Sequence, residues 1–349
     1  MLNKNLKLLS LAGSALTLLA FLSASQTSPA HAQNGRLRQL LQARRAARGQ
    51  GQNTTSQSPG LSMSPQLLQR IEGKAAKLDN FVFNVPYGED PLQKLDIYTL
   101  PPEAKEKYGD KNRPVVFYVH GGGWHTGDKA MNLEKGQTYA RDGVIYVSVN
   151  YRLAPKDKHP KQIEDVARAF AWTRHNITKY GGNPDHIYVM GHSAGAHLVD
   201  LLATNDKYLQ DVGENLSAIK GVVSLDTASV NLLTVAEGEG GESRLVGPMI
   251  SQAFGSDKAI LKEASPTLCL TAGKKYPPFL LYCGQSRKTA RQTHEEFVQR
   301  LKSLGGKVEL KVVPFNHKEI NVNAGTAGQE MYAECLSFVS GSGESGPQH

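Results

Sequence analysis

A serine framed by two glycines is the first feature of this sequence that could do chemistry. Residues 191–195 read Gly-His-Ser-Ala-Gly and fit the pattern G-x-S-x-G, in which a buried strand turns sharply into a helix with the serine at the apex. The glycines leave room for the strand and the helix to approach each other closely. Ser193 would then present its hydroxyl at a helix N-terminus, where N–H groups favour negative charge. Because the pattern also arises by chance, its meaning depends on the rest of the chain.

A run of three glycines lies upstream of this serine. The apolar segment 114–119 runs into His-Gly-Gly-Gly-Trp at residues 120–124. Three glycines allow the backbone to direct several N–H groups at one point, which is what an oxyanion hole requires. We expect the N–H groups of Gly122, Gly123 and Ala194 to hold the oxyanion. The alternative interpretation is a flexible turn between a strand and a loop.

The two motifs, at residues 120–124 and 191–195, resemble the α/β-hydrolase family in its carboxylesterase/lipase branch. The resemblance extends from about residue 85 to about residue 338. It implies an α/β fold with a mostly parallel eight-stranded sheet and helices on both faces, in one domain over residues 61–340. It also implies a serine hydrolase that acts without a cofactor and without a metal.

The serine needs a base, because a serine hydroxyl is a poor nucleophile at neutral pH, and the base needs an acid that orients it. His317 is the expected base. It follows the last expected strand, residues 308–313, and a proline that ends that strand, so we expect it in a loop. The chain has 11 histidines, and only this position beyond the last strand distinguishes His317 from the others.

The acid does not stand where the resemblance implies. In related hydrolases it follows the strand that corresponds to residues 279–283, and here Arg287 occupies that position. Asp226 ends the preceding strand at the same edge of the sheet, and neighbouring strands are only about 5 Å apart. We therefore predict that Asp226 is the triad acid. The alternatives are a turn or capping role for Asp226, and Glu319 as a weaker candidate acid.

Two further residues are candidates for substrate contact, Trp124 after the glycine run and His192 in the serine motif. For Trp124, an aromatic packed beside the glycine turn is an equal alternative. His120 is expected to brace the glycine loop.

Apolar segments that alternate with amphipathic ones predict the elements that position these residues. We expect strands over residues 81–88, 93–98, 114–119, 144–151, 187–190, 219–226, 279–283 and 308–313, and helices over residues 64–78, 132–141, 162–180, 194–204, 289–303 and 329–339. This alternation favours a mostly parallel sheet covered on both faces. Residues 227–266 do not fit it and are expected to form either a lid over the site or a surface loop.

The N-terminal segment is not expected to belong to the core. Residues 1–32 combine two lysines, an apolar run and Ala-His-Ala, which predicts a secretory signal peptide and an exported protein, periplasmic or secreted; the alternative is an uncleaved membrane anchor. Residues 33–60 are basic and polar and predict a disordered linker. The net charge of +8 owes much to this linker, which would contact an anionic envelope surface or act as a solvated tether. No nucleic-acid motif accompanies the basic balance, and the polar tail 341–349 is expected to be disordered.

Three cysteines, Cys269, Cys283 and Cys335, show no spacing typical of a metal site. In an exported protein one disulfide could form, and the sequence does not choose the pair. Three buried thiols are the alternative.

These observations favour a serine carboxylic-ester hydrolase that acts on short-chain or small aromatic esters through an acyl-enzyme. Arylformamidase-like hydrolysis of an amide or formamide uses the same constellation and stays open. A hydrolase-fold protein that binds a partner without turnover is a further alternative, because the usual acid is missing. The sequence leaves the oligomeric state and the physiological substrate open.

Overall fold

The computed structural model describes residues 65–75, 78–227, 229–238 and 241–341. The expected signal peptide, the basic linker and all but the first residue of the expected tail lie outside the described residues. Within the described residues, no helix combines the length and the apolarity needed to cross a membrane.

The described residues form one sheet of eight strands in the order β1-β2-β4-β3-β5-β6-β7-β8. The first two pairings, β1 with β2 and β2 with β4, are antiparallel, and all the others are parallel. The predicted α/β class with a mostly parallel eight-stranded sheet is confirmed. The strands are β1 (Phe81–Pro86), β2 (Lys94–Tyr98), β3 (Arg113–Val119), β4 (Ile145–Val149), β5 (Gly182–His192), β6 (Ile219–Leu225), β7 (Phe279–Gly284) and β8 (Val308–Val313).

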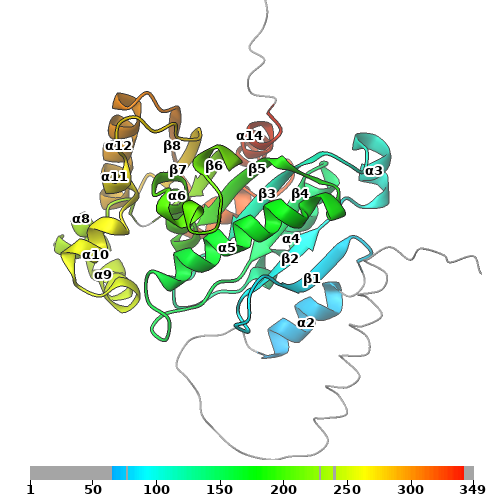
Figure 1. The fold of residues 1–349 in the computed structure, drawn as a ribbon, viewed down its shortest axis with the longest axis horizontal. Coiled ribbons are helices and arrows are strands. Elements are labelled where there is room, and N and C mark those ends of the chain that lie inside the picture. The colour runs from blue at the N-terminus through cyan, green and yellow to red at the C-terminus, as the bar shows by residue number, and fades with distance from the viewer. Residues whose placement is uncertain (1–64, 76–77, 228, 239–240, 342–349) are drawn as a thin grey trace, which may run out of the picture.

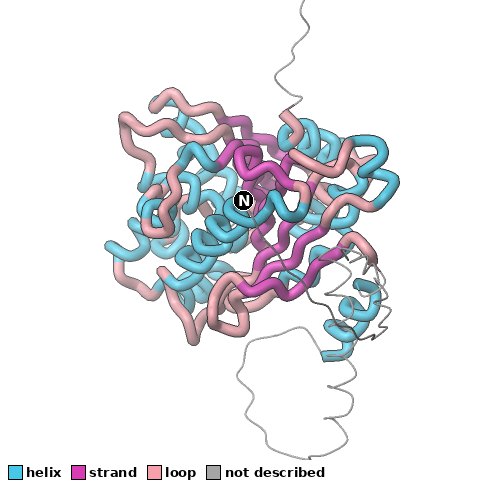
Figure 2. Tube along the Cα trace, turned by 45° about the vertical axis from the view of Figure 1, so that its right-hand side comes forward, coloured by secondary structure: helices cyan, strands magenta, loops and turns pink. Residues whose placement is uncertain are grey.

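Helices cover both faces of the sheet, as Figures 1 and 2 show. One hydrophobic core packs α5 (Lys161–Asn176), α6 (Ala194–Thr204) and α12 (Lys288–Ser303) against the sheet. A second core packs α4 (Leu133–Arg141), α13 (His317–Asn323) and α14 (Glu330–Val339) against the opposite face. The central strands are buried on both faces because each lies between these two layers, which explains their continuous apolar sequence.

The remaining helical elements join and flank these layers. They are α2 (Pro65–Ala75), α3 (Pro102–Tyr108), η1 (Lys129–Asn132), η2 (Ile177–Tyr180), α7 (Lys207–Gln210), η3 (Leu216–Ala218), α8 (Leu232–Glu237), α9 (Gly241–Phe254), α10 (Lys258–Glu263) and α11 (Pro266–Cys269).

The span 227–266, expected as a lid or a surface loop, is largely helical. It contains α8, α9, α10 and the start of α11. Gly247 and Pro248 within α9 argue against a helix on propensity alone. The helix forms because its far end buries Ile250 and Phe254 in the core, so tertiary packing outweighs propensity.

The loop expected around His317 is also a helix, α13, and the prediction of a loop is wrong. The Asn316 side chain accepts hydrogen bonds from the backbone N–H groups of Lys318 and Glu319, and Glu319 accepts one from the Asn316 N–H. This is a capping box, and its sequence signature, a capping residue followed three positions later by Glu, was readable from the chain.

The three cysteines all lie in the described part of the chain and form no disulfide. Cys283 and Cys335 are buried and Cys269 is half-buried. Burial raises the pKa of Cys335 to about 12, so its thiol stays protonated at neutral pH.

Candidate active site

Ser193 stands between β5 and α6 in a backbone conformation that few residues adopt. Its φ is 56° and its ψ is −120°. A Cβ on Gly191 would lie 2.3 Å from the carbonyl oxygen of Gly195, and a Cβ on Gly195 would lie 2.1 Å from that of Val119. Both positions therefore require glycine, as the sequence pattern indicates. The close packing around these two glycines holds the serine in its strained conformation at the end of the strand. Strained residues held in this way are typical of functional sites.

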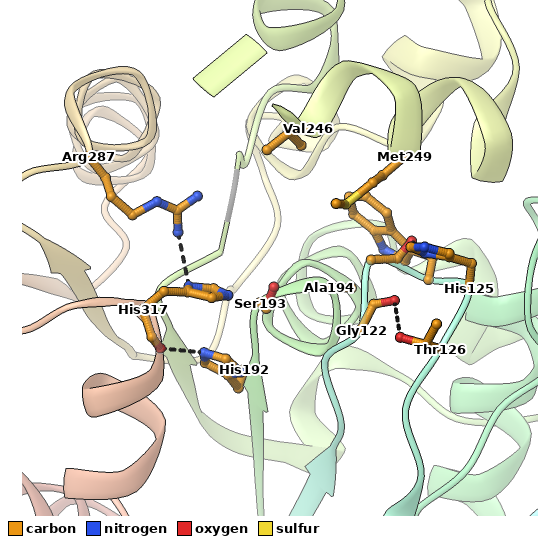
Figure 3. Close-up of a pocket in the computed structure, with 12 residues that line it drawn as sticks. Gly122, His125, Thr126, His192, Ser193, Ala194, Val246, Met249, Arg287 and His317 are labelled. Atoms are coloured by element: carbon orange, nitrogen blue, oxygen red, sulfur yellow. Dashed lines mark hydrogen bonds between the residues drawn. The ribbon is translucent and has the colours of Figure 1, made fainter. Parts of the chain in front are cut away.

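The glycine run after β3 forms a tight loop beside this serine. Gly122 and Gly123 have φ values of 126° and 60°. The Gly122 carbonyl accepts hydrogen bonds from the Thr126 N–H and hydroxyl, both at 3.0 Å. This turn holds the loop so that Gly122, Gly123 and Ala194 line the same cavity as Ser193 (Figure 3). That all three line one cavity is what the prediction of an oxyanion hole requires of them.

The cavity has a volume of about 450 Å³, in the usual range for small-molecule sites. The glycine loop and the serine turn form one side of it, and His317 and Arg287 lie on another. Val246 and Met249 of α9 also line it, so the helical span 227–266 contributes to its wall.

His317 and Asp226 meet at the carboxyl edge of the sheet. His317 Nδ1 lies 2.6 Å from Asp226 Oδ2, within the 3.2 Å reach that a triad contact requires. The Asp226 side chain is fully buried, and its Oδ1 accepts a hydrogen bond from the Gly284 N–H at 2.9 Å. Figure 3 shows the far edge of the His317 ring directed toward Ser193. Ser193 and His317 thus line one cavity, and Asp226 contacts the ring nitrogen of His317 on the side away from Ser193.

Glu319, the weaker candidate acid, is not part of this contact. Its carboxylate accepts the backbone N–H of Asn316 at 2.8 Å and caps α13. The side chain has a structural role at the helix N-terminus, where a negative charge is favourable.

Arg287, which occupies the position where related hydrolases carry the acid, contacts Asp226. Its Nη1 donates to Asp226 Oδ2 at 2.7 Å and to the Asp226 backbone carbonyl at 3.0 Å. The same nitrogen lies 3.3 Å from His317 Nδ1. Sequence reasoning noted Arg287 only as the residue that replaces an acid and missed these contacts. The sequence carries no signal for them, because they depend on how the ends of the strands meet in space.

The surroundings keep Asp226 ionised. Burial by itself would raise its pKa, but the hydrogen bond from His317, the positive charge of Arg287 and the Gly284 N–H outweigh burial. Together they hold the pKa of Asp226 well below its usual range. A permanent carboxylate on Nδ1 favours the tautomer in which His317 Nε2 accepts a proton.

His192 lines the cavity and also supports the base. Its Nε2 lies 2.9 Å from the backbone carbonyl of His317, to which it donates a hydrogen bond. The two rings lie 4.4 Å apart between centroids. Burial, with a contribution from His317, lowers the pKa of His192 to about 3, so the ring is neutral at physiological pH. His192 thus lies at the cavity, where a substrate contact was predicted, and it also supports His317, a role that the sequence did not reveal.

Trp124 was expected either to contact the substrate or to pack beside the glycine turn, and its position fits both roles. The side chain is buried, and it lines the cavity. Its indole N–H donates to His197 Nδ1 at 3.3 Å, and His197 Nε2 donates to the Ala264 carbonyl at 2.8 Å. Burial lowers the pKa of His197 to about 4, which keeps the ring neutral and able to serve both contacts. This chain of bonds ties the glycine loop to the helical span 227–266.

Across the described ranges, no group of three or more His, Cys, Asp or Glu side chains is placed to hold a metal ion.

Comparison with known proteins gives a consistent result. A family model described as BD-FAE matches residues 95–300, more than half of the chain. The esterase LipQ of Mycobacterium tuberculosis is 31% identical over 294 residues, which cover 77% of this chain and 64% of that protein. The probable isoprenylcysteine alpha-carbonyl methylesterase ICMEL1 of Arabidopsis thaliana is 28% identical over 240 residues, which cover 65% of this chain and 48% of that protein. The chain thus spans about half to two thirds of the length of these curated relatives.

Among solved structures, the hyperthermophilic esterase of the archaeon Pyrobaculum calidifontis superposes with a TM-score of 0.61. The two are 22% identical, and the match covers 81% of this chain and 99% of the other. At this identity the likeness supports the fold alone.

Proposed function

The chain belongs to the BD-FAE family of α/β-hydrolases, and from that premise we propose that it is a serine carboxylic-ester hydrolase. The observation that carries the proposal is that Ser193 and His317 line one cavity with the glycine loop while the buried Asp226 carboxylate contacts His317 Nδ1. These residues supply a nucleophile, a base and an orienting acid, which together suffice for acyl transfer.

In the proposed reaction the Ser193 hydroxyl attacks the acyl carbon, and His317 Nε2 takes the hydroxyl proton. The N–H groups of Gly122, Gly123 and Ala194 hold the oxyanion of the tetrahedral intermediate. The intermediate collapses to an acyl-enzyme as His317 passes the proton to the departing alcohol. A water molecule, deprotonated by the same imidazole, then attacks the acyl-enzyme and releases the carboxylic acid.

The proposed substrates are short-chain or small aromatic esters. The cavity volume of about 450 Å³ supports a small acyl group, and the side chains of Val246, Met249 and Trp124 give it apolar walls. The proteins named above carry the names of esterases.

Hydrolysis of chromogenic acetate and butyrate esters tests the proposal, with and without a serine-reactive phosphonate. We expect turnover that the phosphonate abolishes, with the adduct found on Ser193 by mass spectrometry, and no turnover by Ser193→Ala. Turnover by Ser193→Ala within tenfold of the wild type would refute the assignment. An aryl formamide in the same panel separates ester hydrolysis from the amide alternative.

We also propose that the protein is exported and that processing follows Ala32. The lysines, apolar run and Ala-His-Ala of residues 1–32 support this proposal. Intact-mass measurement of exported material is expected to give a chain that starts at Gln33. A mass that retains residues 1–32 would favour a membrane anchor instead.

A further inference from the structure

The proposed triad acid comes from a strand that is not adjacent to the strand before its base. Asp226 follows β6, His317 follows β8, and β7 lies between them. Two strand spacings are about 10 Å. The carboxylate must therefore cross the end of β7 to reach the imidazole, and something must hold it in that direction.

The end of β7 is shaped for this crossing. Gly284 donates its N–H to Asp226 Oδ1 at 2.9 Å, and a Cβ there would lie 2.9 Å from the Phe315 carbonyl oxygen. Asp226 itself has a φ of 52°, in the left-handed region that non-glycine residues rarely occupy. A backbone strained in this way persists only where its surroundings hold it.

Arg287 supplies a further restraint on Asp226. It precedes α12 as the N-cap residue, and its Nη1 donates both to the side chain and to the backbone carbonyl of Asp226. One nitrogen that binds both groups fixes the carboxylate relative to its own peptide. The Asp226 side chain is fully buried and that of Arg287 is 16% exposed, so water screens the ion pair little.

We propose that Arg287 is a positioning residue, which aims the Asp226 carboxylate at His317 and tunes the proton affinity of that pair. The proposal rests on the proposed hydrolase function. In this arrangement an arginine at one strand end makes a carboxylate from the neighbouring strand usable as the triad acid.

The position of Arg287 has a second consequence. Its Nη1 lies 3.3 Å from His317 Nδ1, which donates to Asp226, so two donors share one acceptor oxygen. The other ionisable groups around His317 lie on β5, α4 and α13 itself: neutral His192, Lys135 acting on His192, Lys318 and Glu319.

The test compares Arg287→Met and Arg287→Gln with the wild type over a range of pH. We expect kcat to fall at least tenfold while KM stays within twofold, because the acid is no longer aimed. We also expect the acid limb of the kcat/KM profile to move by about one pH unit, because Arg287→Met and Arg287→Gln remove a charge beside the Asp226–His317 pair. Melting temperatures identify a variant that fails to fold, and the other variant then carries the test.

Two further variants sharpen the result. Arg287→Lys keeps the charge, so its acid limb should stay within half a pH unit of the wild type (about a threefold change in proton affinity) while kcat recovers only in part. Arg291→Met removes an arginine one turn further along α12 that pairs with Glu295 on the surface, and it should behave as the wild type.

An unmoved acid limb in Arg287→Met overturns the proposal whatever the loss of rate, and so does a kcat within twofold of the wild type. A change confined to KM would overturn it as well, because it would assign Arg287 to the substrate. The pH profile of phosphonate labelling at Ser193 is measured in parallel. If phosphonate labelling persists and the Arg287 variants match the wild type, this inference is refuted and the proposed function stands. If the wild-type protein is neither labelled by the phosphonate nor turns over the esters, both are refuted.

Discussion

At the scale of single residues, strained backbone conformations are concentrated at the candidate active site. Five non-glycine residues of the described chain have a positive φ, and three of them, Trp124, Ser193 and Asp226, lie at the candidate site. Each such residue typically costs about 1–3 kcal/mol. The strain places the nucleophile and the acid at the ends of adjacent strands, β5 and β6. Function is thus expected to be maintained at the expense of stability.

This strain can be measured at Ser193. At φ 56° and ψ −120°, a glycine is far less strained than any residue with a Cβ. We expect Ser193→Gly to be more stable to unfolding than Ser193→Ala by about 1–2 kcal/mol, with both variants inactive. Chemical denaturation of the two variants checks this. Equal stabilities would show that the apex carries no strain.

At the scale of elements, helix α9 forms a wall of the cavity rather than a detached lid. Met249 lies so close to the glycine loop that a Cβ on Gly123 would approach its sulfur to 2.8 Å. Val246 and Met249 face the cavity, whereas Leu245 on the same helix is 72% exposed. The size of the Met249 side chain should therefore limit the length of the acyl group.

Truncation of this wall should change selectivity more than chemistry. We expect Met249→Ala to raise the kcat/KM ratio of hexanoate to acetate esters by about tenfold, the low end of the value of one methylene in an apolar pocket. Leu245→Ala is the matched control and should leave the ratio unchanged. If both variants lose activity on all esters equally, α9 has no part in acyl selection.

Most of the elements were predictable, because strands buried between two helical layers must be apolar throughout and helices that cover them must be amphipathic. The serine and histidine followed from their positions in this pattern. The contact of Arg287 with Asp226 was not predictable, because it depends on three strand ends meeting in space. The α9 helix was hidden by Gly247 and Pro248, and α13 was missed although its capping box was legible.

At the scale of the whole molecule, buried polar groups join the core of α4, α13 and α14 to the site. The most telling is Lys135 of α4, which donates to Asn321 of α13 at 2.6 Å and lies over the Tyr118 ring at 4.7 Å. Tyr118 of β3 donates to the same Asn321 oxygen at 2.9 Å. These contacts fix the helix whose first residue is His317, and they require a lysine to be buried.

The buried lysine should be visible in the pH dependence of stability. Burial lowers the pKa of Lys135 to about 7 from 10.5. Between these values the unfolded chain binds a proton that the folded chain does not, so the free energy of unfolding should rise with pH. We expect the stability of the wild type relative to Lys135→Met to increase between pH 7 and pH 9, by up to about 1.4 kcal/mol per pH unit. Denaturant titrations of both proteins measure this, and a difference that is constant with pH would contradict it.

The central claim is that Asp226 works with His317 and Ser193 as the triad acid, and the turnover number of Asp226→Asn tests it most directly. The change keeps the shape of the side chain and removes the charge that faces His317 Nδ1. We expect kcat to fall by two to three orders of magnitude, about 3–4 kcal/mol of transition-state stabilisation. Glu319→Gln alters the nearby carboxylate that caps α13 and should stay within a fewfold of the wild type. A kcat for Asp226→Asn within tenfold of the wild type, or a larger loss in Glu319→Gln, would contradict the claim.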